Sequence, residues 1–569
     1  MSFYEKKWWK EAIGYEIYLK SFKDSNNDGI GDLNGIREKL DYLKDLGVTL
    51  LWICPFYKSP MDDNGYDVSD YFTVDPAFGT LDDMKNLIKE AHQKGLKVII
   101  DFVLNQTSDE HQWFIESRKS KNNPYRDYYI WADGRVVDGK LIEPTNWASF
   151  FGGSCWEYDK QTEQFYMKIF SKKMPDLNWA NKEVRLAMQE TARFWLDLGI
   201  DGFRADAVAH IGRRKRLSDS TMKSTEKYKP DWRMFSNLPV LFDYLKEFKE
   251  NVFSKYDIMT VGEVGGGATP SEAIRYAGVK EGSLSMVFNF DHCWSNNVWQ
   301  LTDPHQEVKV DLINLKKVFD KWQRGQYEKA WAPIYWLNHD QPRLMSHYGN
   351  PKKPYLSGSM LGSALYFMWG TPFIYQGEEI GMTNYPFKTI ADFNDISVKN
   401  LYQIEVVQNK RSQTEFINKI SFTSRDNART IMNWDDSKYA GFSNVEPWFK
   451  ITPDYREVNV KKALESEKSI LKHYRKIFRL RKDKNYLPTL VYGTYKQILK
   501  QNPHVYAYLR EADKTILTVV NFFDFETLVY LRGYRVVKIL LSNYDDSSTV
   551  LTKLKLRSYE AVTYLVEKR

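Results

Sequence analysis

Eight short apolar runs recur along the 569-residue chain, and amphipathic stretches separate several of them. Residues 36–47 (IREKLDYLKDLG) and 81–95 (LDDMKNLIKEAHQKG) show the apolar spacing of helices. Alternation of strands with helices predicts parallel pairing, and eight such units predict a closed α/β structure, a (β/α)₈ TIM barrel. The eight predicted strands are GYEIYL (14–19), TLLWIC (49–54), KVIIDFVL (97–104), GIDGFRAD (199–206), IMTVGE (258–263), SMVFNF (285–290), APIYWLN (332–338) and GTPFIYQG (370–377).

Two segments depart from this alternation. Residues 107–177 are loop-rich and aromatic, and their length predicts an inserted subdomain after the third strand rather than a loop. After about residue 484, apolar runs alternate with turns and long helices are lacking, which is typical of an antiparallel β domain. The predicted division is a barrel at 1–106 and 178–484, a subdomain at 107–177 and a C-terminal β-sandwich at 485–569.

Composition and charge exclude several classes of protein. The net charge of +7 is small for this length, and the basic cluster at 213–216 is more typical of a solvated surface than of a nucleic-acid patch. The chain has no run of about 18 apolar residues and no secretory signal pattern, so we expect neither a membrane span nor export. Cys54, Cys155 and Cys293 form no disulfide framework or zinc spacing, which favours a reducing cytosol.

Charged and polar residues stand where several predicted strands end. In a (β/α)₈ barrel the carboxyl ends of the strands meet at one face, which carries the active site. One such acid could be a structural ion pair, but three acids together with arginine and histidine at one face favour catalysis. The residues concerned are Asp101, Asn105, Gln106, Arg204, Asp206, Glu263, Asn338, His339 and Asp340.

Paired carboxylates suit the hydrolysis of glycosidic bonds. One must attack or shield a carbon that becomes cationic, while the other must protonate the departing oxygen and therefore needs a raised pKa. Arg204 precedes Asp206 by two residues and shares its face of the strand, so we expect it to keep Asp206 ionised. Glu263 ends an apolar strand and precedes Val-Gly-Gly-Gly, a setting that favours a partly desolvated acid.

Four stretches resemble the conserved regions of glycoside hydrolase family 13, the α-amylase family: DFVLNQTSDEH (101–111), GFRADAV (202–208), TVGEVGG (260–266) and NHDQPR (338–343). Residues 8–33, 370–387 and 424–429 are similar to its oligo-1,6-glucosidase and α-glucosidase branch. The resemblance covers nearly the whole chain. It implies a retaining, exo-acting α-glucosidase that releases glucose from short α-linked oligosaccharides through a covalent glycosyl-enzyme.

The resemblance also implies roles for individual residues. Asp206 corresponds to the nucleophile, Glu263 to the general acid/base and Asp340 to a third acid that binds sugar hydroxyls. His339 and Arg204 correspond to residues that contact the same sugar, the −1 sugar, whose anomeric carbon reacts. The remaining substrate residues are Asp67, which would grip the glucose at the blind end, Tyr66, which would stack on it, Gln106, and Arg425 near the +1 side.

The loop 24–32 (DSNNDGIGD) places oxygen ligands at alternate positions. Such spacing suits one hard cation, although position twelve is Gly35 and not the glutamate of an EF-hand. The loop resembles the single calcium loop of the α-glucosidase branch, which implies a structural Ca²⁺; a metal-free polar turn is the alternative. The expected ligands are Asp24, Asn26, Asp28, the Ile30 carbonyl and Asp32.

Four positions bear on specificity. Gln106 stands where the family carries histidine, and an amide can donate a hydrogen bond but cannot become cationic. Met174 and Asn433 stand where this branch usually has glutamine, which suggests altered specificity. Ala207 follows the nucleophile where oligo-1,6-glucosidases tend to have valine, and this smaller residue predicts preference for α-1,4 or another compact linkage over α-1,6.

Two other functions compete. A transglycosylase such as a sucrose isomerase or trehalose synthase would share the covalent intermediate, but the RLDRD-type motif of sucrose isomerases is absent. A non-catalytic member of the family would lack the acids. The sequence leaves open the preferred sugar, the use of a phosphorylated sugar and the choice between monomer and dimer.

Overall fold

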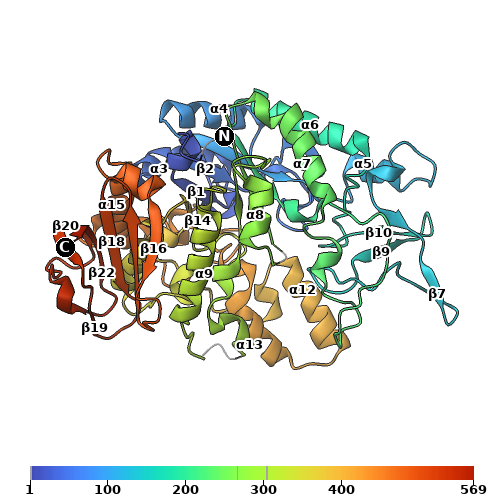
Figure 1. Ribbon diagram of the computed structural model, residues 1–569. Helices are drawn as coiled ribbons and strands as arrows, with labels where there is room; N and C mark the ends of the chain where they lie inside the picture. The colour runs from blue at the N-terminus through green and yellow to red at the C-terminus, as the bar shows by residue number, and fades with distance from the viewer. Residues whose placement is uncertain (1–2, 266, 303–305, 569) are drawn as a thin grey trace.

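The computed structural model describes residues 3–265, 267–302 and 306–568, and its centre is an eight-stranded parallel sheet (Figure 1). The strands follow the order β13-β12-β11-β5-β2-β1-β15-β14, and β13 lies next to β14, so the sheet is nearly closed into a barrel. Each of the eight predicted runs contains one of them, which confirms the predicted (β/α)₈ fold. Their bounds are β1 (Gly14–Ile17), β2 (Leu50–Ile53), β5 (Lys97–Val103), β11 (Gly202–Asp206), β12 (Met259–Glu263), β13 (Met286–Phe288), β14 (Pro333–Ile334) and β15 (Thr371–Tyr375).

Successive residues of each barrel strand point to opposite faces of the sheet and belong to two different apolar clusters. Trp52 stacks on Phe288, with ring centroids 5.4 Å apart, and Phe288 meets Phe373 edge-on at 5.1 Å. These three rings come from three different strands and fill the barrel interior. Their strand neighbours, such as Leu51 and Ile53, belong to the second apolar cluster, between strands and helices. Side chains two residues apart on a strand share a face, so the inward positions can carry the site at the strand ends.

The helices that cover the barrel include α4 (Leu81–Gln93), α6 (Lys182–Asp197), α7 (Val240–Asn251), α8 (Pro270–Ala277), α9 (Leu312–Gln326), α11 (Pro354–Tyr366) and α15 (Ile470–Lys482). A capping box opens α4, because the Thr80 side chain accepts from the Asp83 amide and the Asp83 carboxylate accepts from the Thr80 amide.

The helix expected over 36–47 is instead two helices, α2 (Leu33–Glu38) and α3 (Leu40–Leu46), because Lys39 between them leaves the helical conformation. No helix in the described ranges is both long and apolar enough to cross a membrane.

The segment 107–177 forms a small antiparallel unit. Strands β6 (Trp131–Ala132), β10 (Gln164–Met167) and β9 (Trp156–Asp159) make one sheet, and β7 (Arg135–Val137) pairs with β8 (Lys140–Ile142). A second excursion, which the sequence did not predict, contains α12 (Ile396–Tyr402) and α13 (Gln413–Thr423). The two excursions meet at Gly152 (φ 87°), where a Cβ would come within 3.1 Å of Ile404. These segments therefore build one wall beside the carboxyl ends of the strands.

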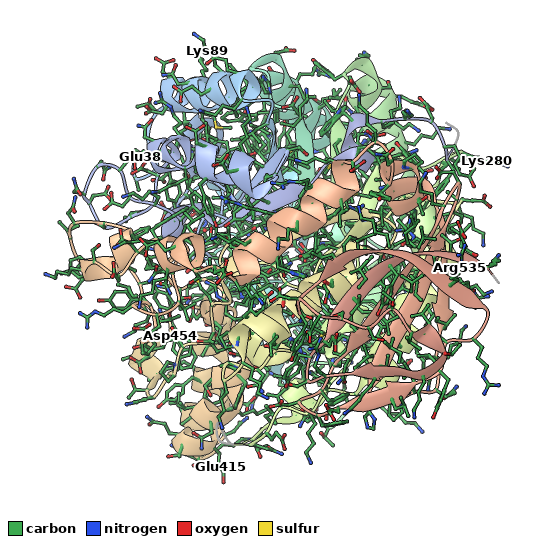
Figure 2. The ribbon with its side chains drawn as sticks, turned by 90° about the vertical axis from the view of Figure 1, so that its left-hand side faces the viewer. Glu38, Lys89, Lys280, Glu415, Asp454 and Arg535 are labelled. Atoms are coloured by element: carbon green, nitrogen blue, oxygen red, sulfur yellow. The ribbon has the colours of Figure 1, made fainter. Side chains whose placement is uncertain are left out.

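The C-terminal region is an antiparallel sheet in the order β16-β17-β18-β22-β20, on the opposite side of the barrel from the inserted strands (Figure 1). The strands are β16 (Thr494–Ile498), β17 (Val505–Glu511), β18 (Thr515–Asn521), β22 (Ala561–Lys568) and β20 (Tyr534–Ser542), and a separate pair joins β19 (Thr527–Val529) to β21 (Leu554–Leu556). Figure 2 shows the molecule from the side of the C-terminal sheet, and charged side chains such as Lys89 of α4 and Arg535 of β20 project outward there. The sheet packs on α11, so it buttresses the barrel away from the strand ends.

Candidate active site

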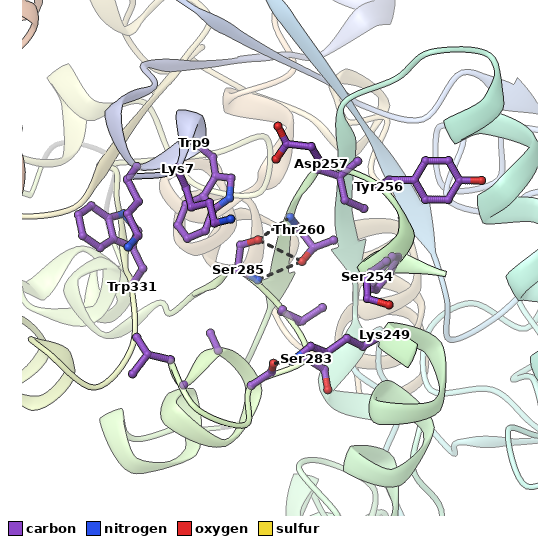
Figure 3. Close-up of a pocket in the computed structure, with 18 of the residues that line it drawn as sticks. Lys7, Trp9, Lys249, Ser254, Tyr256, Asp257, Thr260, Ser283, Ser285 and Trp331 are labelled. Atoms are coloured by element: carbon purple, nitrogen blue, oxygen red, sulfur yellow. Dashed lines mark hydrogen bonds between the residues drawn. The ribbon is translucent and has the colours of Figure 1, made fainter. Parts of the chain in front are cut away.

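One cavity, of about 390 Å³, lies near the amino end of β12 (Figure 3). Its polar groups satisfy one another: the Ser285 amide donates to Thr260 Oγ1 at 3.0 Å, and Lys249 Nζ donates to the Gly282 carbonyl at 2.7 Å. Asp257 is the one acid among its described lining residues. This cavity cannot supply the paired carboxylates that the sequence predicts.

A second cavity, of about 230 Å³, opens at the carboxyl ends of the strands. Of the predicted catalytic and substrate residues, all but Arg204 and Asp67 line it. The lining consists of Asp63, Tyr66, Gln106, Phe150, Phe151, Phe170, Met174, Asp206, Ala207, His210, Glu263, Gly265, His339, Asp340 and Arg425. The geometry thus brings together acids from three different strand ends, as expected from the fold.

The Arg204 guanidinium lies beneath this cavity and joins three carboxylates. Nη1 donates to Asp101 Oδ1 and to Asp206 Oδ1, each at 2.5 Å, and Nη2 donates to Glu263 Oε2 at 2.5 Å. The contacts follow from strand register: Arg204 pairs with Asp101 on β5 and with Val261 on β12, two residues before Glu263. All four charged groups occupy inward positions directly above the apolar barrel interior.

Burial and neighbouring charges act differently on the acids. Burial raises the pKa of Asp206 well above its ordinary value, and the Arg204 guanidinium opposes that rise. Burial also acts to raise the pKa of Asp340, but His339, Arg425 and Arg429 hold it well below its ordinary value. Asp340 therefore stays ionised and can accept hydrogen bonds from hydroxyls, whereas the charge of Asp206 depends on Arg204.

Asp340 is held by Arg429 and His339. Arg429 Nη2 donates to its Oδ1 at 2.9 Å, and His339 Nε2 lies 3.2 Å from its Oδ2. The Tyr66 hydroxyl lies 2.8 Å from the same His339 nitrogen, and the two rings stack with centroids 5.3 Å apart. Tyr66 and His339 thus reach the cavity as one rigid pair.

The structure corrects the expected position of Asp67. Its side chain is fully buried and accepts the backbone amides of Asp62, at 2.8 Å, and Asp63, at 3.1 Å, so it holds the loop and not the cavity wall. Asp63 lines the cavity instead, and its Oδ1 accepts from Arg425 Nη2 at 2.9 Å. The sequence MDDNGYD has three acids within six residues, and nothing local shows which of them faces the sugar.

The three unusual side chains lie in different surroundings. Gln106 lines the cavity with its amide held, since Nε2 donates to the Tyr66 carbonyl at 3.2 Å and Oε1 accepts from Asn105 at 3.1 Å. Met174 adds an apolar surface to the same wall. Asn433 is fully buried outside the lining and donates to Thr452 Oγ1 at 2.9 Å, so the specificity expected from this position is not supported.

An aromatic wall was missed by the sequence reasoning. Phe150 stacks on Phe170 at 5.5 Å, and the Arg425 guanidinium lies 4.8 Å from the Phe151 ring. His210 completes this wall; burial lowers its pKa to about 3, so it is neutral. The sequence SFFGG at 149–153 was the available signal, but which aromatic residues of the subdomain face the strand ends depends on tertiary packing.

The loop 24–32 closes on itself through its acids. Asp24 accepts the amides of Asn27, at 2.7 Å, and Gly29, at 2.9 Å, while Asp32 accepts the amides of Ser25 and Gly35. Asn27 (φ 65°) and Gly29 (φ 88°) make the tight turn. Within the described part of the chain, no lysine or arginine forms an ion pair with Asp24, Asp28 or Asp32. The donor set therefore fits a hard cation.

Comparison with known proteins agrees with this site. Residues 16–493 match the family model described as alpha amylase, catalytic domain. An oligo-1,6-glucosidase of Parageobacillus thermoglucosidasius is 46% identical over 577 residues, which cover 99% of each chain. A crystal structure of Bacillus licheniformis trehalose-6-phosphate hydrolase is similar with a TM-score of 0.90 and 39% identity, covering 99% of this chain and 100% of that one. Trehalulose synthase from Pseudomonas mesoacidophila MX-45 is similar with a TM-score of 0.92 and 38% identity, with the same coverage.

Substitution of Asp63 and of Asp67 separates a cavity acid from a loop acid. We expect Asp63→Asn to reduce kcat/KM on a small α-glucoside by about 10-fold or more, since it removes a charged acceptor from the cavity. We expect Asp67→Asn to lower Tm, because its amide cannot accept both backbone N–H groups. Kinetics and thermal unfolding of both variants check this. If Asp67→Asn kept the wild-type Tm but lost turnover, Asp67 and not Asp63 would be the residue that contacts the sugar.

Proposed function

The chain belongs to the α-amylase family and is an exo-acting α-glucosidase of short α-glucosides, in which we propose that Asp206 is the nucleophile and Glu263 the general acid/base. The observation that carries these assignments is the single guanidinium that links both carboxylates at 2.5 Å, at the ends of adjacent strands and within one cavity. A retaining mechanism needs two carboxyl groups roughly 5–5.5 Å apart, and a shared guanidinium holds these two close to each other.

The reaction runs in two displacements. Asp206 attacks the anomeric carbon of the −1 sugar and forms a glycosyl ester, while Glu263 protonates the departing glycosidic oxygen. Glu263 then takes a proton from water, which hydrolyses the ester and restores Asp206. The Glu263 side chain is 23% exposed and that of Asp206 is 9% exposed, so the acid/base is the group open to leaving group and water.

The surrounding charges hold the sugar. Asp340 stays ionised and accepts from the sugar hydroxyls beside the reacting carbon, as its lowered pKa allows. We assign to Asp63 the role at the closed end that the sequence analysis gave to Asp67. Because Arg425 pairs with Asp63, this assignment places Arg425 beside the −1 sugar and not near the +1 side, where the sequence analysis put it. Gln106 offers its amide to this sugar in place of an imidazole.

The transglycosylase alternative receives less support than hydrolysis. The trehalulose synthase is 38% identical to this chain, below the 46% of the glucosidase relative. The hydrolytic assignment also agrees with the missing RLDRD-type motif. We place the enzyme in a reducing compartment such as the cytosol, because Cys54, Cys155 and Cys293 are buried and unpaired.

Ala207 is proposed to set the linkage preference. It lines the cavity, and its amide lies 3.4 Å from Glu263 Oε2, so its side chain stands beside the scissile bond. A methyl group here leaves more space than the valine typical of oligo-1,6-glucosidases. We therefore propose preference for α-1,4 over α-1,6 linkages, in contrast to the name of the Parageobacillus relative.

The loop 24–32 is proposed to hold one structural Ca²⁺ through Asp24, Asn26, Asp28, the Ile30 carbonyl and Asp32. Asp24 also accepts from the Ser443 hydroxyl at 2.5 Å, so the loop ties the start of the barrel to a segment more than 400 residues later. A cation here would supply cross-linking of this loop and no chemistry, because none of its ligands lines the cavity.

The function is tested by the first product and by three variants. Proton NMR of glucose released from maltose should show the α-anomer first; initial β-glucose would exclude the covalent mechanism. We expect kcat to fall by about 10²–10⁴-fold in Glu263→Gln and by more than about 10⁴-fold in Asp206→Asn, with unchanged Tm. Asp257→Asn, which removes the acid of the other cavity, is the matched control and should keep wild-type turnover.

Linkage preference is tested by kcat/KM for maltose and isomaltose. We expect wild type to prefer maltose and Ala207→Val to shift the ratio towards isomaltose by roughly 10–200-fold. Ala207 has φ 46°, where a β-branched residue is strained, so Tm must accompany the kinetics. Ala207→Gly, which suits this conformation, should keep the preference for maltose. A wild type that prefers isomaltose would contradict the proposal.

The cation is tested by thermal unfolding. A ligand bound only to the native state stabilises it by about 2.7 kcal/mol at a hundredfold excess over Kd, so millimolar calcium should raise Tm relative to EDTA. Asp28→Asn removes one ligand and should remove most of this increase. Identical melting in calcium and EDTA would show that the loop is a metal-free turn.

A further inference from the structure

His339 lies between two carboxylates from different parts of the chain. Its Nδ1 is 2.6 Å from Glu16 Oε1, and its Nε2 is 3.2 Å from Asp340 Oδ2. Asp340 lines the cavity, whereas Glu16 belongs to β1, is 1% exposed and lies behind the cavity wall. The imidazole therefore separates an acid that faces the sugar from an acid that does not.

Packing fixes the ring in this orientation. The rings of Tyr66 and Tyr18 lie nearly parallel to the imidazole, with centroid distances of 5.3 and 6.1 Å and interplanar angles of 12° and 18°. The His339 amide also donates to Glu16 Oε1 at 3.3 Å, so the same carboxylate oxygen holds both backbone and ring. Neither nitrogen can exchange partners without moving these elements.

The hydrogen bonds restrict the tautomer. A carboxylate only accepts, so the bond to Glu16 places a proton on Nδ1. Nε2 lies 2.8 Å from the Tyr66 hydroxyl and 3.2 Å from Asp340 Oδ2. The ionised Asp340 favours a proton on this nitrogen too, and the Tyr66 hydroxyl oxygen can accept from it as well. An imidazolium at this position has a hydrogen-bond acceptor at each ring nitrogen, as a buried charge requires.

We propose, on the basis of the function above, that Glu16 is a positioning residue that holds His339 as an imidazolium whose Nε2–H points at Asp340 and the −1 sugar. Glu16 then supplies one counter-charge of the imidazolium from outside the cavity, and Asp340 supplies the other. The carboxylate oxygens of Asp340 keep further lone pairs that can accept from the sugar hydroxyls.

Burial raises the pKa of Glu16, and the hydrogen bond and charge of His339 oppose that rise. Burial lowers the pKa of His339, but Asp340 raises it well above its ordinary value. The further charged groups near it are the acids Asp101 and Asp206 and the cations Arg204 and Arg429. The uncharged titratable neighbours are Cys54, 3.9 Å from Nδ1, together with Tyr18, Tyr66 and Tyr375.

Glu16→Gln keeps an oxygen for Nδ1 and removes the charge. A carboxylate partner raises the pKa of a histidine, so its loss makes His339 lose its proton at lower pH. We expect the pH at which His339 loses its second proton, measured by nitrogen-15 NMR, to fall by about one pH unit or more in Glu16→Gln. Tyr375→Phe removes only an uncharged hydroxyl near the same pair and should leave this pH in place.

Nitrogen-15 NMR of the histidine side chains of the substrate-free wild type tests the proposal without any variant of Glu16. The His339 signal, assigned by its loss in His339→Asn, should show two protonated nitrogens at pH 7. A neutral imidazole at pH 7, or an unchanged deprotonation pH of His339 in Glu16→Gln, would overturn the proposal. Neither result would affect the roles of Asp206 and Glu263, which the anomer and Asp206→Asn test separately.

Discussion

One buried cation makes the active site possible. Asp206 and Glu263 end β11 and β12, and Asp101 lies two residues before the end of the neighbouring β5. Carboxylates placed so close together above an apolar barrel interior would repel one another. The Arg204 guanidinium contacts all three, and its planar fork has enough donors to do so. Removing such a partner leaves uncompensated buried charge, which typically costs 3–5 kcal/mol. Fold stability and the charge of Asp206, the proposed nucleophile, therefore depend on the same side chain.

Other buried arginines show how their partners determine their role. Arg425 and Arg429 face acids around the cavity, and both contact Asp340. Arg481 and Arg510 instead donate to backbone carbonyls: Arg481 to Tyr366, Met368 and Gly370, and Arg510 to Phe367, Leu490 and Gly493. Arg481 thereby joins α15 to the segment that follows α11, and Arg510, on β17, joins the C-terminal sheet to the same segment. Burial lowers the pKa of Arg481 to about 9, as expected for a cation that meets dipoles and not carboxylates.

The parts of this arrangement that follow strand period and strand ends could be predicted from the sequence. The eight runs mark the barrel strands, and acids such as Asp206 and Glu263 end them, so a single rule places them at one face. The rule does not extend to loops. Asp63 and Asp67 lie four residues apart in one loop, and their roles are decided by Arg425, 362 residues from Asp63. The break at Lys39 was likewise invisible in the apolar spacing, because both short helices keep the same buried face.

The walls of the cavity come from inserted segments whose tertiary contacts cannot be predicted from the spacing of apolar residues. The inserted subdomain contributes Phe150, Phe151, Phe170 and Met174, and the excursion with α12 and α13 packs against it at Gly152. The reacting groups stand on strands and are bound to one another, whereas the surfaces that face the second sugar stand on loops. Mutations in these loops can therefore reshape the +1 side without disturbing the contacts of Arg204. The reacting groups and the surfaces that we expect to set specificity therefore belong to different elements. Ala207 is the exception, because it directly follows β11 and also lines the cavity.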